Sequence, residues 1–161
     1  MLKKIGIFLI FFLVLLSSSI SAAPAKETKQ AAFIKKVYTS QGKTYITVDY
    51  VDFLRGEAAA RAMREAGECD DQDGDCYPPD DYYIRNVNPK LRTFPLNKNV
   101  PIYVQKLHFT YDAPVDTYKK YTPASFKALS TSSKNYIVTD VPYWLTLKGD
   151  TITKIEEQFI P

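Results

Sequence analysis

Residues 33–53 read FIKKVYTSQGKTYITVDYVDF, and this run carries the pattern of a β-hairpin. β-Branched and aromatic residues are frequent in both halves, and residues 40–43 supply a polar, glycine-containing turn between them. In the second half Ile46, Val48 and Tyr50 alternate with polar residues, which gives this strand one apolar face. We therefore expect two antiparallel strands around the turn, with a bend just after Tyr50, where the alternation changes phase.

The rest of the chain predicts further strands and two short helices. Five of the ten residues 57–66 are alanine, the best helix former, and Gly67 follows where a helix commonly ends. Thr122 and Pro123 are a helix-start signal for a second helix that ends near Leu129. Further strands are expected at residues 82–86, 100–111, 143–147 and 151–159.

Strands joined by consecutive hairpins favour an α+β fold over a parallel α/β fold. We expect either a small, bent antiparallel β-barrel (OB-like) or an open antiparallel sheet, with two short helices inserted between the strands. Residues 32–161 are long enough for one core and are predicted to form a single α+β barrel domain. Residues 23–31 are polar and are predicted to be a disordered lead-in.

The N-terminus has the composition of a signal peptide. Lys3 and Lys4 are followed by an apolar run to Leu16 and then by small residues up to Ala22. An uncleaved membrane anchor is the alternative, but this apolar run is too short to span about 30 Å of hydrocarbon. We therefore expect cleavage after residue 22 and secretion of a protein with no membrane association.

The charges are divided unevenly along the chain. Without Lys3 and Lys4 the mature protein keeps 19 of its 21 Lys and Arg, against 18 Asp and Glu. Residues 65–81 hold eight of these acids and no basic residue, so the remainder is basic. The Lys and Arg are dispersed and form no basic helix or nucleic-acid motif, so we expect no nucleic-acid partner.

The acidic run is the main candidate for a ligand site. Asp71, Asp73 and Asp75 alternate around Gly74, and calcium takes six to eight oxygens, largely from carboxylates on a tightly turning loop. We predict that these three aspartates bind calcium, with Asp70 and Asp80 completing the shell. The run resembles the calcium loops of thrombospondin type 3 repeats, but it lacks the closing glutamate of an EF-hand. A solvated loop without metal is the alternative.

Cys69 and Cys76 enclose the densest part of this run. They are the two cysteines of the chain, and two cysteines in an exported protein usually pair. We therefore expect a disulfide that holds the aspartates together before metal arrives. Their spacing, with no histidine nearby, disfavours zinc.

Two stretches carry a resemblance to a protein group. The first is DDYYIRNVNPKLRT at residues 80–93, and the second is PYWLTL at 142–147 followed by ITKIEEQ at 152–158. Together they resemble a group of exported, uncharacterised proteins of Gram-positive bacteria. The group has no established activity, so the resemblance implies export and assigns no catalytic residue.

Candidate binding residues come from the aromatic and arginine side chains near these stretches. Exposed tyrosine and tryptophan can stack on sugars or dock a protein, and arginine can bind an anion. The residues selected on this basis are Tyr82, Tyr83, Arg85, Arg92 and Trp144.

The sequence favours a binding role over an enzymatic one. His108 is the one histidine of the chain, and its place in a predicted strand favours a structural role. No Gly-x-Ser-x-Gly motif is present, so no catalytic residue is assigned. We expect a secreted, non-catalytic protein that binds a cell-surface polymer or a protein partner. The alternative is an extracellular hydrolase that acts on a cell-wall or environmental polymer.

Overall fold

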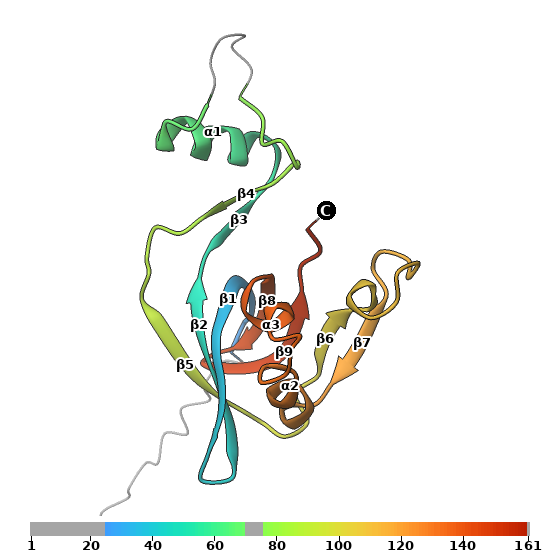
Figure 1. The fold of residues 1–161 in the computed structure, drawn as a ribbon. Coiled ribbons are helices and arrows are strands. Elements are labelled where there is room, and N and C mark those ends of the chain that lie inside the picture. Colours follow the sequence, from blue (N-terminus) through green and yellow to red (C-terminus); the bar gives the residue numbers. More distant parts are fainter. Residues whose placement is uncertain (1–24, 70–75, 161) are drawn as a thin grey trace, which may run out of the picture.

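The computed structural model describes residues 25–69 and 76–160, and these residues are mainly β-structure. Its strands lie in one large mixed sheet and one small two-stranded sheet (Figure 1). The elements are β1 Glu27–Ser40, β2 Lys43–Tyr50, β3 Asp52–Leu54, α1 Gly56–Ala66, β4 Tyr83–Arg85, β5 Leu91–Leu96, β6 Ile102–Gln105, the 3-10 turn η2 Lys106–His108, β7 Tyr118–Tyr121, α2 Pro123–Leu129, α3 Tyr136–Thr139, β8 Pro142–Lys148 and β9 Thr151–Glu157.

The large sheet has the strand order β5-β2-β1-β8-β9-β6-β7. All neighbouring pairs are antiparallel except β6 and β9, which are parallel. The prediction of an antiparallel fold is therefore wrong for this pair, because a local pattern of hairpins does not reveal the direction of a distant partner. The sheet has two edge strands, β5 and β7, and no closed barrel is found within the described ranges, so the predicted barrel is not confirmed.

The predicted hairpin is present as β1 and β2. Ile34 lies opposite Val48 and Val37 lies opposite Ile46. Between these two pairs β1 contains a β-bulge. Gln41 and the following glycine, with φ of 48° and 73°, make the turn. Two positive φ values match the right-handed twist of the flanking strands.

The predicted bend after Tyr50 is also confirmed. Strand β2 ends there, and the chain resumes at Asp52 as β3, which pairs with β4 in the small sheet. At the bend, the Val51 N–H donates to the Ala31 carbonyl at 3.0 Å. The backbone therefore stays hydrogen-bonded to β1 while it changes direction.

Strand β1 begins earlier than the sequence indicated. Residues 27–31 are strand, so the predicted disordered lead-in is wrong over this part. This segment pairs with β8, from Glu27 opposite Lys148 to Phe33 opposite Pro142. The polar composition of this segment gives no local sign of a strand. Its backbone is hydrogen-bonded to β8, which lies more than a hundred residues away in the sequence.

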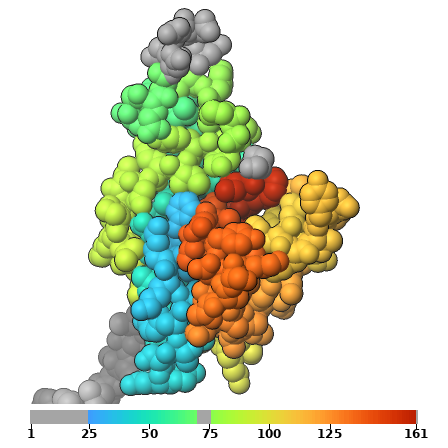
Figure 2. Space-filling view, in the orientation of Figure 1, coloured from blue at the N-terminus to red at the C-terminus, as the bar shows by residue number. Residues whose placement is uncertain are grey.

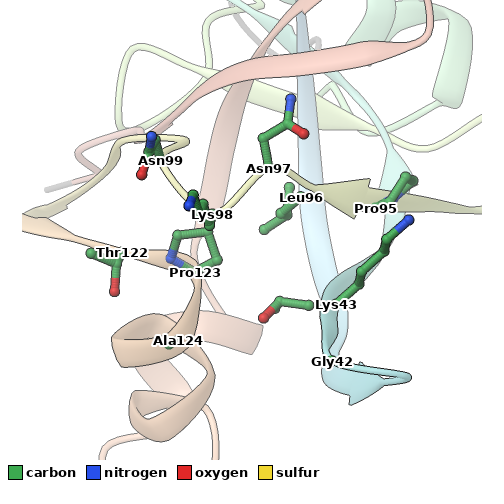
Figure 3. Close-up of a pocket in the computed structure, with 11 residues that line it drawn as sticks. Gly42, Lys43, Pro95, Leu96, Asn97, Lys98, Asn99, Thr122, Pro123 and Ala124 are labelled. Carbon is green, nitrogen blue, oxygen red and sulfur yellow. The ribbon is translucent and has the colours of Figure 1, made fainter.

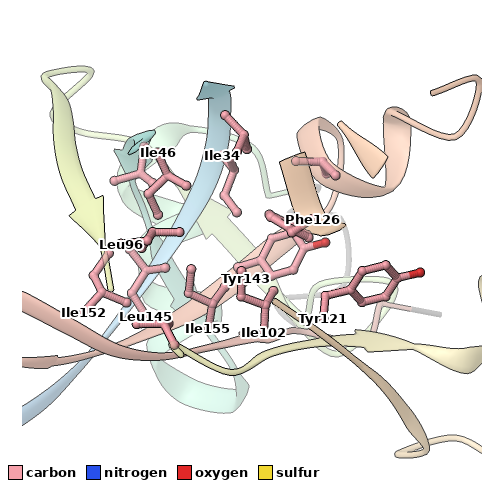
Figure 4. Packing of buried hydrophobic residues seen from close by; sticks show 14 of the residues in the cluster. Ile34, Ile46, Leu96, Ile102, Tyr121, Phe126, Tyr143, Leu145, Ile152 and Ile155 are labelled. Atoms are coloured by element: carbon pink, nitrogen blue, oxygen red, sulfur yellow. The ribbon is translucent and has the colours of Figure 1, made fainter. Parts of the chain in front are cut away.

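Helices α2 and α3 pack on one face of the large sheet (Figure 1). The hydrophobic core lies between these helices and the sheet. Thr122 and Ser125 cap α2 reciprocally, with each side chain bonded to the backbone N–H of the other. Phe126 and Tyr143 meet edge to face at the centre of this core, with ring centroids 5.8 Å apart (Figure 4). The buried apolar residues labelled there are Ile34, Ile46, Leu96, Ile102, Tyr121, Phe126, Tyr143, Leu145, Ile152 and Ile155.

Both predicted helices are confirmed, as α1 and α2, and so are β4 and the C-terminal hairpin of β8 and β9. The single strand predicted at residues 100–111 is wrong, because β6 ends at Gln105 and η2 follows. Strands β5 and β7 and helix α3 were not predicted.

A small extension projects from the large sheet. It comprises residues 52–69 and 76–85 and contains β3, α1 and β4, with α1 packed on β4 (Figure 1). In the space-filling view this extension rises from one end of the body that the seven strands form and touches it at its base (Figure 2). In the described part of the chain, no helix is long and apolar enough to cross a membrane.

Candidate functional site

Helix α1 positions the cysteine pair at the end of the extension. Gly67 ends this helix in the left-handed region, with φ of 69°, and its N–H donates to the Arg64 carbonyl at 3.1 Å. The next N–H, from Glu68, donates to Met63 at 3.0 Å. These two bonds satisfy carbonyls that the helix leaves free and direct the chain into Cys69.

The predicted disulfide between Cys69 and Cys76 is present, with the two Cα atoms 5.4 Å apart. Cys76 is buried, and its Sγ lies 3.4 Å from the carbonyl oxygen of Ala60. This approach is a packing contact, since a disulfide sulfur carries no hydrogen to donate. The bridge is therefore fixed against the body of α1.

Four of the five predicted calcium ligands, Asp70, Asp71, Asp73 and Asp75, lie outside the described residues. Asp80 lies in an exposed turn before β4. Among the described residues, no group of three or more His, Cys, Asp or Glu side chains has a metal-binding arrangement.

Two of the predicted binding residues, Tyr82 and Trp144, lie on either side of Phe53. Tyr82 stacks on the Phe53 ring at 5.1 Å, and Trp144 meets it edge to face at 6.1 Å. The indole N–H of Trp144 donates to Gln158 Oε1 at 2.8 Å. Because β3 supplies Phe53 and β8 supplies Trp144, this aromatic group joins the extension to the large sheet.

Arg85 links the strands and helix of the extension. Its guanidinium donates to Asp52 Oδ2 at 3.1 and 3.2 Å and to Glu65 Oε2 at 2.9 Å. Asp52 and Glu65 are therefore the structural partners of Arg85. Arg85 and Tyr83 share the wall of a shallow cavity of about 520 Å³ beside α1.

Arg92 lies in a different place, on the edge strand β5. Its guanidinium carbon lies 4.2 Å from the centroid of the Tyr50 ring, and its Nη1 donates to the Lys90 carbonyl at 2.8 Å. The stacking is a cation–π contact on the core-facing rim of the sheet. The structure therefore distributes the five predicted binding residues over three places: the aromatic group, the shallow cavity and the β5 edge.

A histidine–carboxylate pair that the sequence did not predict lies at the end of β9, with its carboxylate buried. His108 Nε2 lies 2.6 Å from Glu157 Oε1, and the side chain of Glu157 is only 3% exposed. The second carboxylate oxygen accepts the backbone N–H of Gln105 at 2.8 Å. Strand β9 supplies Glu157, whereas η2 supplies His108, so residues far apart in the chain form the pair.

Burial raises the pKa of the Glu157 carboxyl group above its ordinary value of 4.5. The hydrogen bonds from His108 and Gln105 act in the opposite direction, since they stabilise the ionised form, but burial has the larger effect. Burial also raises the pKa of Tyr143, whose hydroxyl donates to the Ile137 carbonyl at 2.6 Å.

One signal in the sequence pointed to Glu157. Strand residues two positions apart share a face, so Ile155 and Glu157 lie on the same side of β9. Ile155 is fully buried, and a carboxylate that continues its face must be buried and partnered. His108 could not be chosen as its partner in this way, because no local pattern connects η2 with β9.

A wide cavity of about 640 Å³ lies between the β1–β2 turn and α2, at the end of the sheet opposite the extension (Figures 1 and 3). The β1–β2 turn forms one side, and the first turn of α2 forms the other. Lys43 and Lys98 are its charged wall residues, Asn97 and Asn99 add polar groups, and no carboxylate residue contributes to the wall. This composition suits an anionic or hydroxyl-rich ligand.

Comparison with models of protein families, with curated proteins and with solved structures gives no match to this chain.

Proposed function

We propose that this protein is a secreted, non-catalytic binding protein that attaches to an anionic cell-surface polymer. The observation that carries the proposal is the wide cavity of Figure 3, which has two lysines and no carboxylate in its wall. A chain of phosphate or carboxylate groups would gain attraction from both lysines and hydrogen bonds from Asn97 and Asn99. A protein partner with an acidic segment is the alternative occupant.

Retention on cell-wall polymer tests this role. We expect the purified protein to be retained on anionic wall polymer at low salt and released as ionic strength rises, because salt screens exposed charges. Replacing Lys43 and Lys98 together by alanine should weaken retention about tenfold, which corresponds to about 1.4 kcal/mol. The matched control replaces Lys120 and Lys148, two exposed lysines outside the cavity. Equal loss in both double variants would show that only overall charge matters, and the cavity would be excluded.

We also propose that the acidic loop binds calcium. The disulfide supports this proposal because it holds the Cα atoms of Cys69 and Cys76, which flank the aspartate run in the sequence, 5.4 Å apart. The acids at the two ends of the run have basic partners in the protein: Arg85 contacts Glu65, and Arg55 contacts Asp81 at 3.3 Å. Residues 66–80 contain no Lys or Arg, so an external cation would compensate the aspartates between these ends.

Calorimetric titration of the mature protein with calcium tests the metal site. Extracellular sites bind calcium at about 10⁻⁴ to 10⁻³ M, so heat should be measurable at millimolar metal. Asp73→Ala should abolish this heat, whereas Asp112→Ala, an exposed aspartate outside the run, should leave it unchanged. Absence of heat from the unaltered protein would refute the calcium proposal and leave the polymer proposal standing.

The His108–Glu157 pair favours a second candidate function, an extracellular hydrolase. A carboxylate that orients an imidazole is the arrangement of a general base, and hydrolysis would use it to activate water. Release of soluble fragments from cell-wall polymer measures this activity directly. Activity that Glu157→Gln abolishes would support the hydrolase. Binding without fragment release would support the non-catalytic role.

A further inference from the structure

The large sheet has a reverse face, opposite the one on which α2 and α3 pack. On the helix side, Phe126 of α2 and Ile137 of α3 join the buried core. Successive side chains of a strand point to opposite faces, so residues that alternate with the core-facing ones lie on the reverse face. The pairing of the strands shows which of these residues are neighbours.

Four side chains form a row across the reverse face. Trp144 of β8 lies beside Glu156 of β9 in the ladder. Tyr103 of β6 is the next neighbour of Glu156, and Lys120 of the edge strand β7 ends the row. None of the four belongs to the core cluster, and each is partly or fully exposed. We call these four residues the reverse-face row.

The two rings of this row are held in place by neighbouring side chains. The Trp144 indole N–H donates to Gln158 Oε1 at 2.8 Å, and the Phe53 ring meets the indole edge to face at 6.1 Å. The Tyr118 ring supports Tyr103 in the same way, with centroids 6.3 Å apart. Rings that are fixed before binding lose little conformational freedom when a ligand contacts them.

The spacing of the rings matches a repeating ligand. One strand, β9, separates Trp144 from Tyr103. Neighbouring strands lie about 4.8 Å apart, so the two residues are about 10 Å apart across the sheet, the length of a disaccharide unit in an extended β-1,4-linked chain. Alternate sugars of such a chain present the same face, and the C–H face of a sugar packs on an aromatic ring. Two sugars of one chain would therefore contact both rings together.

The charges in and beside the row disfavour an ionic ligand. Glu156 lies between the rings and accepts a hydrogen bond from Lys154 Nζ at 2.9 Å, so these two charges compensate each other within the protein. A polyanion would be repelled by this carboxylate, and a polycation would be repelled by Lys154 and Lys120. A neutral chain of hydroxyl groups suits both signs, because a hydroxyl group donates and accepts hydrogen bonds.

The separation of the rings also disfavours a protein partner. The centre of a protein–protein interface is normally a continuous patch that is depleted in charged residues. Here Glu156 divides the aromatic surface of the row into two parts. We propose that the reverse-face row binds a neutral, extended glycan that lies across the strands.

In this complex one sugar stacks on Trp144 and another on Tyr103, and the sugar between them forms hydrogen bonds with Glu156 and Lys154. None of these residues lines the wide cavity or lies in the acidic loop. Failure of the glycan test therefore leaves the polymer and calcium proposals standing.

The test uses cellohexaose as the probe and maltohexaose as the comparison. Trp144 is the only tryptophan, so its indole N–H gives one signal in the NMR spectrum of the ¹⁵N-labelled mature protein. Cellohexaose should shift this signal with a dissociation constant of about 1 mM or lower. Maltohexaose has the same sugars in a curved α-1,4-linked chain that does not reach both rings, so it should bind at least about tenfold more weakly.

Variants at Tyr103 separate ring stacking from other contacts. Tyr103→Phe keeps the ring and should bind cellohexaose as the unaltered protein does. Tyr103→Leu keeps an apolar side chain without a flat ring and should bind at least about tenfold more weakly. The matched control is Tyr136→Ala on α3, which removes a 44% exposed ring from the helix side and should leave binding unchanged.

Three results would overturn the proposal. The first is no shift of the indole signal at saturating cellohexaose, and the second is equal binding of maltohexaose. Both use the unaltered protein, so they decide the question even if the leucine variant fails to fold. The third is tighter binding of cellohexaose that has been oxidised to its polycarboxylate, which would show that the lysines select an anionic chain. Unchanged binding by a folded Tyr103→Leu protein would also exclude the stacking role of this ring.

Discussion

At the scale of the residue, Glu157 is the least exposed acid among the described residues. Glu157 lies on the face of β9 that packs against the core. This position can be inferred from the sequence, because Glu157 is two residues after the buried Ile155. Its partner could not be inferred, because His108 lies in a segment that the sequence predicted to be strand and that forms a 3-10 turn. Local alternation thus indicates which residues are buried, but it does not identify contacts between distant elements.

The raised pKa of Glu157 predicts a specific pH dependence of stability. A folded-state pKa above the unfolded value means that the native protein binds the proton more tightly, so the free energy of unfolding decreases as pH rises from about 4.5 through the folded pKa. Glu157→Gln removes this dependence and keeps an oxygen to accept the Gln105 N–H. In urea unfolding, the stability of the unaltered protein relative to the variant should therefore fall as pH rises over this window.

A control variant at a neighbouring residue of the same strand is needed for the comparison of Glu157→Gln with the unaltered protein. Glu156→Gln, on the opposite face of β9, measures the effect of losing one negative charge there. A relative stability of the Glu157 protein that increased with pH would contradict the prediction. It would mean that the hydrogen bonds from His108 and Gln105 outweigh the cost of burial.

At the scale of the element, helix α1 depends on its C-terminal glycine. An alanine Cβ at position 67 would meet no atom within 4 Å, so only the backbone conformation opposes the substitution. With φ at 69°, Gly67→Ala should destabilise the protein by about 1 kcal/mol, as measured by urea unfolding. Gly67→Asn should cost less, because asparagine tolerates the left-handed region better. Equal stability of the alanine variant would show that the helix end rearranges freely.

Arg85 is expected to hold α1 on the small sheet. Its two ion pairs are partly exposed, so together they contribute only about 1 kcal/mol. Arg85→Ala should speed amide hydrogen exchange in α1 while leaving exchange in β1 and β8 unchanged. Arg61→Ala, on the exposed side of the same helix, is the control. Faster exchange throughout the large sheet would contradict this local role.

Some elements are determined by residues that are neighbours in the sequence, and others by pairing with distant strands. The alanine-rich run, the Thr122–Pro123 start and the two hairpins were predicted, because neighbouring residues determine them. The edge strand β5 was not, since its residues 91–96 include a proline and alternate only weakly; its place beside β2 comes from pairing. Within the binding candidates, the disulfide followed from two cysteines alone, whereas the partners of Arg85 required the fold.

At the scale of the whole molecule, the Phe53 group connects the extension to the large sheet. Phe53→Ala should remove the contacts of Tyr82 and Trp144 with this ring and destabilise the protein by about 2 kcal/mol, less than for a fully buried phenylalanine. Trp144 is the only tryptophan in the chain, so its fluorescence reports on this contact directly. We expect its emission to shift to longer wavelength in the folded variant, because water reaches the indole.

A matched substitution removes an aromatic ring elsewhere. Tyr111→Ala lies in a loop where the side chain is 94% exposed, and it should change neither stability nor emission. Unchanged emission from Phe53→Ala would show that Gln158 and the strand alone fix the environment of Trp144.

The central position of β1 has a consequence for the way the protein acquires its structure. In the order of synthesis β1 precedes its neighbour β8 by more than a hundred residues, so these two strands cannot pair until β8 has been made. Such long sequence separations slow folding. Under the secretion proposed above, this delay would keep the chain unfolded, and therefore able to pass a translocation channel, until β8 is available.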